Sequence, residues 1–271
     1  TNMANIKTKI TNKTWKLFHK LENNSIADFS LNGEENFLDS VVKEYCGKKC
    51  LAFDIGANVG NYSDEIQKKF KKYNVKGEIH VFEPTKSCFQ DLKRRFLKNN
   101  NIFLNNIGLS NEDKKAIIYY DKEESGLASL YQRDLLENNV GLSMEETIQL
   151  KKASEYIEEK EIKHINILKM DVEGHEMAVL EGFGKYLNSK FVDFVQFEYG
   201  GCNMDARLFL RDYYRFLERK DFVIAKVMPK HLEIRDYNIS MENFMYSNYV
   251  AVSKDIKYLN ILNNGYILWP R

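Results

Sequence analysis

The fold is decided by the stretch CLAFDIGANVG, residues 50–60. Its first half is a short apolar run ending in Asp54, the pattern of a buried strand, and its second half holds Gly56 and Gly60, as is typical of a turn. Residues 62–72 follow with apolar positions at helical spacing. A strand, a glycine turn and a helix in this order predict one unit of an α/β sheet, with the turn accessible to a ligand.

The same alternation continues on both sides of this stretch. Helices are expected over residues 34–45, 87–99, 147–158, 175–187 and 206–220. Strands are expected over residues 78–82, 101–107, 115–120, 165–170, 191–197, 222–227 and 246–252, with loops and short turns over 121–146. Alternating strands and helices predict a mostly parallel sheet, and the last two strands, joined only by a loop, predict an antiparallel pair.

Composition limits the function classes. The 271 residues include 40 Lys plus Arg and 39 Asp plus Glu, a formal net charge of +1. This balance argues against broad capture of nucleic acid or of an anionic membrane, although a local patch remains open. No run of about 18 apolar residues could span a membrane. Four cysteines indicate neither a disulfide scaffold nor a zinc site, so reduced thiols and a cytoplasmic protein are expected.

The chain divides into two expected regions. Residues 1–33 are polar, and one short amphipathic stripe predicts a helix near residues 12–22 that packs on the rest as a cap. Residues 34–271 form the main domain. Because the first residue is Thr, a trimmed chain or one domain of a longer chain is expected.

Four of the expected strands end in a carboxylate, at Asp54, Glu83, Asp171 and Glu198. The carboxyl ends of parallel strands share one edge of the sheet, where open α/β folds bind ligands. Each acid alone can be explained as a cap for the following helix. Four on one edge repel one another and cost stability, so together they indicate a ligand site.

The turn after Asp54 is not a dinucleotide-binding turn, because its glycines are spaced more widely than in G-x-G-x-x-G and an acid precedes it. An acid there suits a cationic amino group, which S-adenosylmethionine carries together with its sulfonium. Glu83 lies about 20 residues beyond the turn, where an acid can accept hydrogen bonds from both ribose hydroxyls. The segment NNIGLS, residues 105–110, follows the third strand and offers Asn side chains and backbone to an adenine edge.

The segment KMDVEGHE, residues 169–176, runs from a strand end into a helix start. Asp171 is expected to face the reaction centre. His175 can move protons near neutral pH, although a lone histidine is more often structural. Glu198 precedes a glycine pair, which suggests a flexible loop or a close approach to substrate.

These motifs resemble the FkbM family of S-adenosylmethionine-dependent methyltransferases. The resemblance covers roughly residues 36–252 and rests on DIGANVG (54–60), VFEP (81–84), Asn106 with GLS (108–110), LKMDVEGHE (168–176) and LEG (180–182). It implies a class I methyltransferase fold, which is a Rossmann-like α/β fold. Such a fold has a mostly parallel seven-stranded sheet with helices on both faces and an antiparallel last strand.

The resemblance also implies an O-methyltransferase (EC 2.1.1.-) that uses S-adenosylmethionine and acts on a hydroxyl group, most often of a sugar or glycan. Cofactor contacts are implied for Asp54, Gly56, Ala57, Asn58, Gly60, Glu83, Asn106, Ile107 and Asp171. For catalysis, Asp171 is the first candidate for the general base and His175 the second, while Glu198 could position the base or the acceptor.

Three alternatives stay open at this point. Asp171 and Glu198 could hold a divalent cation that lowers the pKa of the hydroxyl, but two carboxylates are too few to assert a metal site. A nicotinamide-dependent oxidoreductase would use a similar sheet. A non-catalytic module of the same fold would bind a glycan or a partner protein.

Overall fold

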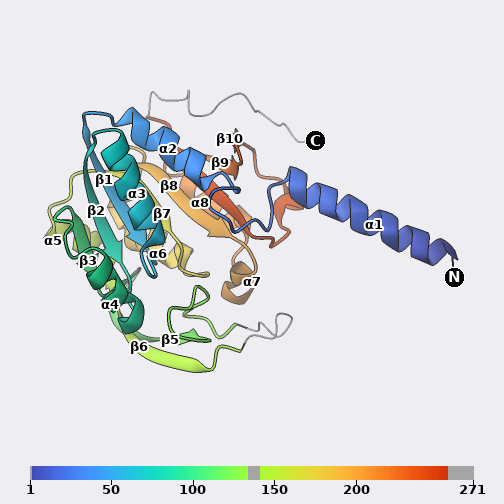
Figure 1. The fold of residues 1–271 in the computed structure, drawn as a ribbon, viewed down its shortest axis with the longest axis horizontal. Helices are drawn as coiled ribbons and strands as arrows, with labels where there is room; N and C mark the ends of the chain where they lie inside the picture. The colour runs from blue at the N-terminus through green and yellow to red at the C-terminus, as the bar shows by residue number, and fades with distance from the viewer. Residues whose placement is uncertain (1, 134–140, 256–271) are drawn as a thin grey trace.

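The computed structural model describes residues 2–133 and 141–255. Its centre is a sheet in the order β10-β9-β11-β8-β7-β1-β2-β3 (Figure 1). Its strands are β1 (Lys49–Ile55), β2 (Lys76–Phe82), β3 (Ile102–Asn105), β7 (Ile165–Met170), β8 (Val192–Tyr199), β9 (Phe222–Met228), β10 (His231–Ile234) and β11 (Ser247–Ser253). Strands β3, β2, β1, β7 and β8 are parallel, and β11 is antiparallel to both of its neighbours.

Helices cover both faces of this sheet. The helices of the described chain are α1 (Asn2–Leu21), α2 (Glu34–Glu44), α3 (Asn61–Lys72), α4 (Lys86–Arg95), α5 (Ala153–Glu159), α6 (Glu176–Gly182), α7 (Cys202–Ala206) and α8 (Leu210–Glu218). One hydrophobic core joins the sheet to α2, α3 and α4, and a second joins it to α5, α6 and α8. The near-continuous burial of strands such as β7 follows from this coverage, and the predicted class I fold with an antiparallel last strand is confirmed.

Two parts of the sheet differ from the prediction. The sheet has eight strands where seven were expected, because β10 adds an antiparallel edge strand beside β9. This strand lies in the segment between β9 and β11 that was expected to be only a loop.

A second, three-stranded sheet in the order β4-β6-β5 lies beside the carboxyl ends of β1 and β2 (Figure 1). Its strands are β4 (Gly108–Ser110), β5 (Lys114–Tyr120) and β6 (Met144–Lys152). The expected helix over residues 147–158 is therefore wrong in its first half, and helix starts only at α5. The reason is a period of two, since Ile148 and Leu150 are buried while Thr147 and Gln149, which alternate with them, are exposed. Of the expected loop over 121–146, residues 134–140 lie outside the described residues.

Several helix and strand ends also differ. The helix expected over 206–220 starts only at Leu210, as α8, because Arg207 adopts a left-handed conformation with φ of 55° that ends the preceding short helix α7. The expected helix over 175–187 ends at Gly182 and continues as a short 3₁₀ turn. The strand expected over 101–107 stops at Asn105, and the chain then enters the second sheet.

The helix near residues 12–22 is confirmed as part of the longer α1, but it does not pack on the sheet. It projects away from the body (Figure 1), and Trp15, Leu17 and Leu21 remain largely exposed. Residues 22–33 return to the body, where the Asn23 side chain donates hydrogen bonds to the carbonyls of Asn32 and Val227. The expected cap is thus a protruding helix with a fixed base.

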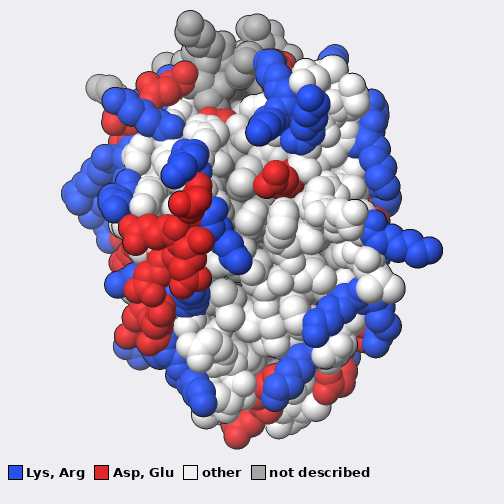
Figure 2. Space-filling model, turned by 90° about the vertical axis from the view of Figure 1, so that its left-hand side faces the viewer, with Lys and Arg blue, Asp and Glu red and all other residues white. Residues whose placement is uncertain are grey.

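Charge is spread unevenly over the surface. On the face drawn in Figure 2, acidic side chains gather along one side and basic ones lie scattered around an uncharged centre. This face has no continuous basic surface of the kind that follows a nucleic-acid backbone. Among the described residues, no helix combines the length and the apolar character needed to cross a membrane.

Candidate functional site

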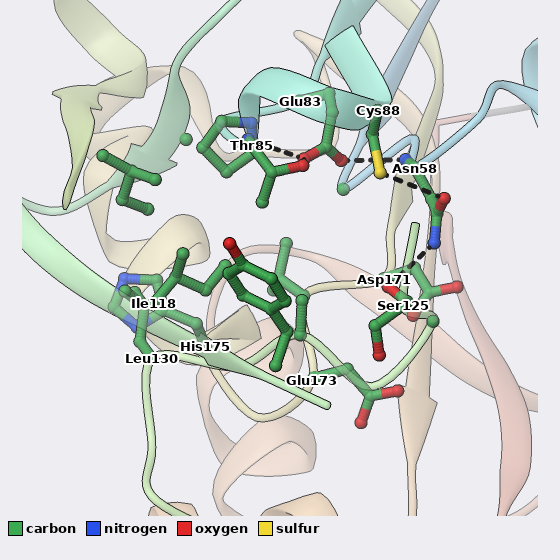
Figure 3. A pocket seen from close by; sticks show the side chains of 18 of the residues that line it. Asn58, Glu83, Thr85, Cys88, Ile118, Ser125, Leu130, Asp171, Glu173 and His175 are labelled. Carbon is green, nitrogen blue, oxygen red and sulfur yellow. Dashed lines mark hydrogen bonds between the residues drawn. The ribbon is translucent and has the colours of Figure 1, made fainter. Parts of the chain in front are cut away.

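Two adjoining cavities lie at the carboxyl ends of β1, β2 and β7. The first, here the apolar cavity, lies between this edge and the second sheet, with Ile118 and Leu130 in its wall (Figure 3). The second, here the acidic cavity, has a volume of about 650 Å³ and is lined by Glu34, Asp54 and Glu198 among others. The residues that line both cavities are Gly56, Asn58, Glu124 and Asp171.

Glu83 lies directly after β2 in the wall of the apolar cavity. Neighbouring groups of the chain occupy most of the hydrogen-bond acceptor positions of its carboxylate. Its Oε1 accepts hydrogen bonds from the Thr85 N–H (2.8 Å) and the Thr85 hydroxyl (2.6 Å), and its Oε2 accepts one from the Asn58 N–H (2.9 Å) (Figure 3). A carboxylate offers roughly four lone-pair positions. Since three are taken, Oε2 can accept one further donor, which is fewer than the two ribose hydroxyls expected from the sequence.

Asp54, at the end of β1, is buried behind the glycine turn. It accepts a 2.5 Å hydrogen bond from the Ser63 hydroxyl of α3, and burial raises its pKa to about 6 although Ser63 and Lys169 oppose the shift. Gly56 has a φ of +80°, and a Cβ there would lie 1.9 Å from the Asp171 carbonyl oxygen. The turn therefore needs glycine so that the ends of β1 and β7 can meet.

Lys169 of β7 holds the carboxylates of the acidic cavity together. Its Nζ lies 3.2 Å from Glu198, 3.6 Å from Asp171 and 4.0 Å from Glu34. Burial alone would lower the pKa of Lys169, but these three acids outweigh burial and raise the pKa well above its ordinary value. A charged lysine thus offsets the repulsion that the cluster of acids would otherwise create.

Asp171 and Glu198 face the same cavity but differ in environment. The Glu198 side chain is only 13% exposed, and burial, reinforced by Asp171, raises its pKa well above the ordinary value against the pull of Lys169. It also accepts a hydrogen bond from the Tyr246 hydroxyl at 3.2 Å. Asp171, by contrast, is 40% exposed and lies where the two cavities meet. The structure therefore leaves Asp171 accessible and encloses Glu198.

His175 is separated from this acidic group. Its Nε2 lies 2.9 Å from the Ser110 hydroxyl, and its ring lines the apolar cavity near Ile118 and Leu130, on the opposite side from Asp171 (Figure 3). Burial, with a smaller contribution from Lys114, lowers the pKa of His175 to about 4. A histidine with this pKa is neutral at physiological pH.

The remaining acids of the motif shape the loop after β7. Glu173, in a left-handed conformation with φ of 48°, forms a 2.5 Å ion pair with Arg133. Burial, together with Asp171, raises the pKa of Glu173 to about 8. Glu176 is fully buried and accepts hydrogen bonds from the N–H groups of Val172 and Gly174. These contacts give both acids a structural role in holding the loop that carries Asp171.

Three residues expected to touch the cofactor lie outside both cavity walls. The Asn106 side chain donates to the carbonyls of Glu83 and Pro84, so it supports the loop after β2 from behind. Ile107 packs against the hydrophobic core. A Cβ at Gly60 would lie 2.6 Å from Leu92, which makes Gly60 a contact between α3 and α4. Instead, Gly108 and Leu109 of the same segment line the apolar cavity.

The structure brings together most of the predicted residues. Asp54, Gly56, Ala57, Asn58, Glu83, Asp171 and Glu198 all line one or both cavities. Their roles remain predictions. Lys169 and Glu34 were not predicted, although a lysine inside the apolar strand ILKM was a signal. Glu34 carried none, because it reaches the site from a helix far away in sequence.

The two cavities suit S-adenosylmethionine by their chemistry. The apolar cavity offers an apolar surface on which the flat adenine ring can pack, with the free lone pair of Glu83 at its edge. The acidic cavity offers Asp54, Asp171 and Glu198 to an ammonium and a sulfonium. Because the cavities join at Gly56 and Asp171, one molecule with an apolar end and a cationic end can occupy both. Within residues 2–133 and 141–255, cavities included, no three His, Cys, Asp or Glu side chains are grouped as a metal ion would need.

Comparison with known proteins identifies the family. The model of the methyltransferase FkbM domain matches residues 54–237. A curated relative, "Methyltransferase 1" of Beauveria bassiana (strain ARSEF 2860), is 28% identical over 144 residues, which are 48% of this chain and 56% of the relative. The chain thus matches little more than half of that relative's length.

Solved methyltransferase structures overlap the chain more loosely. The METTL16 MTase domain matches with a TM-score of 0.46 and 9% identity, over 86% of this chain and 71% of its own. Aeropyrum pernix fibrillarin in complex with natively bound S-adenosyl-L-methionine matches with a TM-score of 0.40 and 12% identity, over 75% of this chain and 66% of its own. The family model, which spans the glycine turn, Glu83, Asp171 and Glu198, carries the identification and sets the nicotinamide-dependent alternative aside. The chain belongs to the FkbM methyltransferase family, and its domain is that of an S-adenosylmethionine-dependent methyltransferase.

Proposed function

We propose that the protein methylates a hydroxyl group of a sugar or glycan, with Asp171 as the general base. The observation that carries this proposal is the accessibility of Asp171. Among the four carboxylates at the strand ends, Asp54, Glu83 and Glu198 are enclosed by their partners, whereas the Asp171 side chain is 40% exposed at the junction of the cavities. A general base must touch the acceptor, and Asp171 is the acid that can.

Besides a base, methyl transfer requires few groups from the protein. S-adenosylmethionine supplies a methyl group on a sulfonium, which is already a good leaving group. The chain's own residues must align the acceptor oxygen, exclude water and take the hydroxyl proton. Asp171 takes that proton on a carboxylate oxygen. The Lys169 ammonium lies 3.6 Å from this carboxylate.

The lining of the acidic cavity supports a neutral acceptor that is rich in hydroxyl groups. Phe29, Tyr62 and Tyr246 present aromatic surfaces on which the apolar face of a sugar ring can pack. Seven acidic side chains and three basic ones line this cavity. Carboxylates accept hydrogen bonds from hydroxyls and repel phosphates, so the charge argues against a nucleic-acid acceptor.

The test is the variant Asp171→Asn, which removes the base and preserves the shape of the side chain. We expect kcat to fall by about 10²–10⁴-fold and the affinity for S-adenosylhomocysteine to fall much less. Binding is measured by calorimetry and turnover by S-adenosylhomocysteine release across a panel of sugar acceptors. Asp236→Asn, at an exposed aspartate that lines neither cavity, is the matched control.

Each other outcome has a defined meaning. Full turnover in Asp171→Asn would remove Asp171 as the base. Cofactor binding by the wild type without turnover on any hydroxyl acceptor would support the non-catalytic module. Turnover that EDTA abolishes would support a cation held by Asp171 and Glu198 in place of simple base catalysis.

A further inference from the structure

Helix α1 carries an apolar stripe that the rest of the described chain leaves largely uncovered. Ile6, Ile10, Leu17 and Leu21 are 52%, 60%, 56% and 64% exposed. Successive residues of a helix are about 100° apart, so spacings of four, seven and four place these side chains within about 60° of arc. Exposed apolar residues aligned in this way mark an interaction surface more strongly than the same residues scattered singly.

Lysines border this stripe on both sides. Lys9, Lys13, Lys16 and Lys20 repeat at intervals of four, three and four and so form one row along the helix, and Lys7 lies on the other border. All five are exposed. No acid occurs before Glu22, so α1 is uniformly basic although the whole chain is almost neutral. This is the local patch that the overall charge balance left open.

The base of α1 is held firmly against the main sheet. Glu22, directly after the helix, forms ion pairs with Arg235 at 2.5 Å and with Lys226 at 3.4 Å. Lys226 also donates to Asn24 at 2.7 Å, and the Ser25 N–H donates to the Tyr246 carbonyl at 2.8 Å. The helix therefore projects from the body from a fixed anchor (Figure 1).

From these features we infer that α1 docks the protein on an anionic lipid surface. The helix lies in the plane of the surface, the apolar stripe enters the boundary between head groups and acyl chains, and the lysines contact the anionic head groups. Long lysine stems suit this arrangement, since their apolar carbons can lie along the stripe while the charges remain in water. This inference concerns α1 alone and does not depend on the proposed acceptor.

A second copy of the chain fits α1 less well. If two α1 helices packed stripe to stripe, the row from Lys9 to Lys20 of each would meet the lysines of the other. Neither helix has an acid before Glu22 with which to pair them. Like charges at a helix interface destabilise it, whereas an anionic surface neutralises every lysine at once.

Docking would also orient the site. The segment that follows α1 contributes Ala27, Phe29 and Glu34 to the acidic cavity. A helix held on a surface at one end of this segment would keep the mouth of the cavity close to that surface, within reach of acceptors that are attached to lipid.

The first test is vesicle co-sedimentation of the full chain. The vesicles are phosphatidylcholine alone or phosphatidylcholine mixed with phosphatidylglycerol. We expect binding only to the mixed vesicles and a steep loss as salt is added. Lys9→Gln with Lys13→Gln should weaken binding about 30-fold, since each lysine near such a surface contributes roughly a factor of five. Lys163→Gln with Lys190→Gln, two exposed lysines outside α1, should leave binding unchanged.

The second test asks which face of α1 enters the lipid. In a Cys46→Ser background, whose remaining cysteines are buried, an environment-sensitive fluorophore is attached at Ile10→Cys or at Asn12→Cys. Position 10 lies on the stripe and position 12 lies about 160° around the helix from it. We expect the fluorophore to enter an apolar environment at position 10 and to remain in water at position 12.

Several results would overturn the inference. They are equal binding to both kinds of vesicle, absence of binding to either, an equal loss in the control variant, or equal signals at positions 10 and 12. Capture of α1 by an acidic protein without vesicle binding would assign the helix to a protein partner instead.

Discussion

Lys169→Met removes the positive charge at the centre of the acidic cavity and nearly preserves the volume of the side chain. The wild-type Nζ lies 3.2 Å from Glu198 and 3.6 Å from Asp171, and the lysine is 3% exposed. Because methionine fills the same space, the variant creates little cavity and tests the charge alone. The remaining carboxylates lose the cation that stabilises them.

The expected cost follows from the burial of these groups. Breaking a buried ion pair by removing one partner costs about 3–5 kcal/mol in the free energy of unfolding. For a chain of this size, 1 kcal/mol changes Tm by about 2–4 °C, so the expected loss is about 6–20 °C. Loss of the cation also changes the pKa of Glu198 in the folded state, so the loss of stability depends on pH.

The direction of this dependence can be derived. In the wild type the pKa of Lys169 is higher in the folded state than in the unfolded state. The contribution of Lys169 to the free energy of unfolding is therefore fully present at every pH below its unfolded pKa, and it is constant through the neutral range. In the variant, the pKa of Glu198, already raised by burial, has lost the opposing pull of Lys169. An acid whose folded pKa lies above its unfolded value destabilises the fold as the pH rises between the two values. The loss in Tm should therefore be small near about pH 5 and large near about pH 8.

Thermal unfolding followed by circular dichroism at both pH values measures this effect. The double variant Lys169→Met with Glu198→Gln is the matched control, because it removes both charges of the closest pair. It should recover part of the Tm lost by Lys169→Met alone. A loss that is equal at the two pH values, or a double variant less stable than the single one, would refute the reasoning.

Two further predictions concern the apolar cavity. Glu83→Gln removes the charge of a carboxylate that accepts hydrogen bonds from the N–H groups of Asn58 and Thr85 and has one lone pair left for a ribose hydroxyl. Because a hydrogen bond to a charged group contributes about 1.5–3 kcal/mol, calorimetry should show S-adenosylhomocysteine affinity reduced about tenfold or more. Unchanged affinity would mean that Glu83 does not contact the cofactor. His175→Gln should leave the dependence of kcat on pH unchanged between about pH 6 and pH 8, because the pKa of His175, lowered to about 4, keeps the ring neutral there. Disappearance of the acid limb of that profile in His175→Gln would instead make His175 the base.

The sequence predicted the central sheet because its signals are local. Strands such as β7 and β8 are short apolar runs that can be recognised without knowing their neighbours. The second sheet was missed because β6 is mostly polar and only Ile148 and Leu150 alternate inward. Nine residues with two buried side chains fit either a strand or the edge of a helix, and the pairing with β5 that decides between them is not a local property.

The candidate site was predictable to the same extent. The carboxylates at the ends of β1, β2, β7 and β8 follow from the rule that parallel strands present their carboxyl ends on one edge. Which of them is free to react does not follow from that rule. Glu83 is occupied by Thr85, two residues away, whereas Glu198 is occupied by Lys169 and Tyr246, which come from other strands or loops. Partners close in sequence can be anticipated, and distant partners require the fold.

This difference explains why the sequence grouped His175 with the acids and left Lys169 out. In the sequence, His175 lies among three acids of one short motif and looks like part of a proton relay. In the structure the chain turns sharply at Gly174, whose φ is +102°, and the His175 ring contacts the Ser110 hydroxyl and lines the apolar cavity. Lys169 lies two residues before Asp171, and alternate residues of a strand share a face, so its Nζ reaches the acids at the strand end. One lysine on that face allows several carboxylates to remain close together, and the acid that stays exposed beside it is Asp171, the proposed general base.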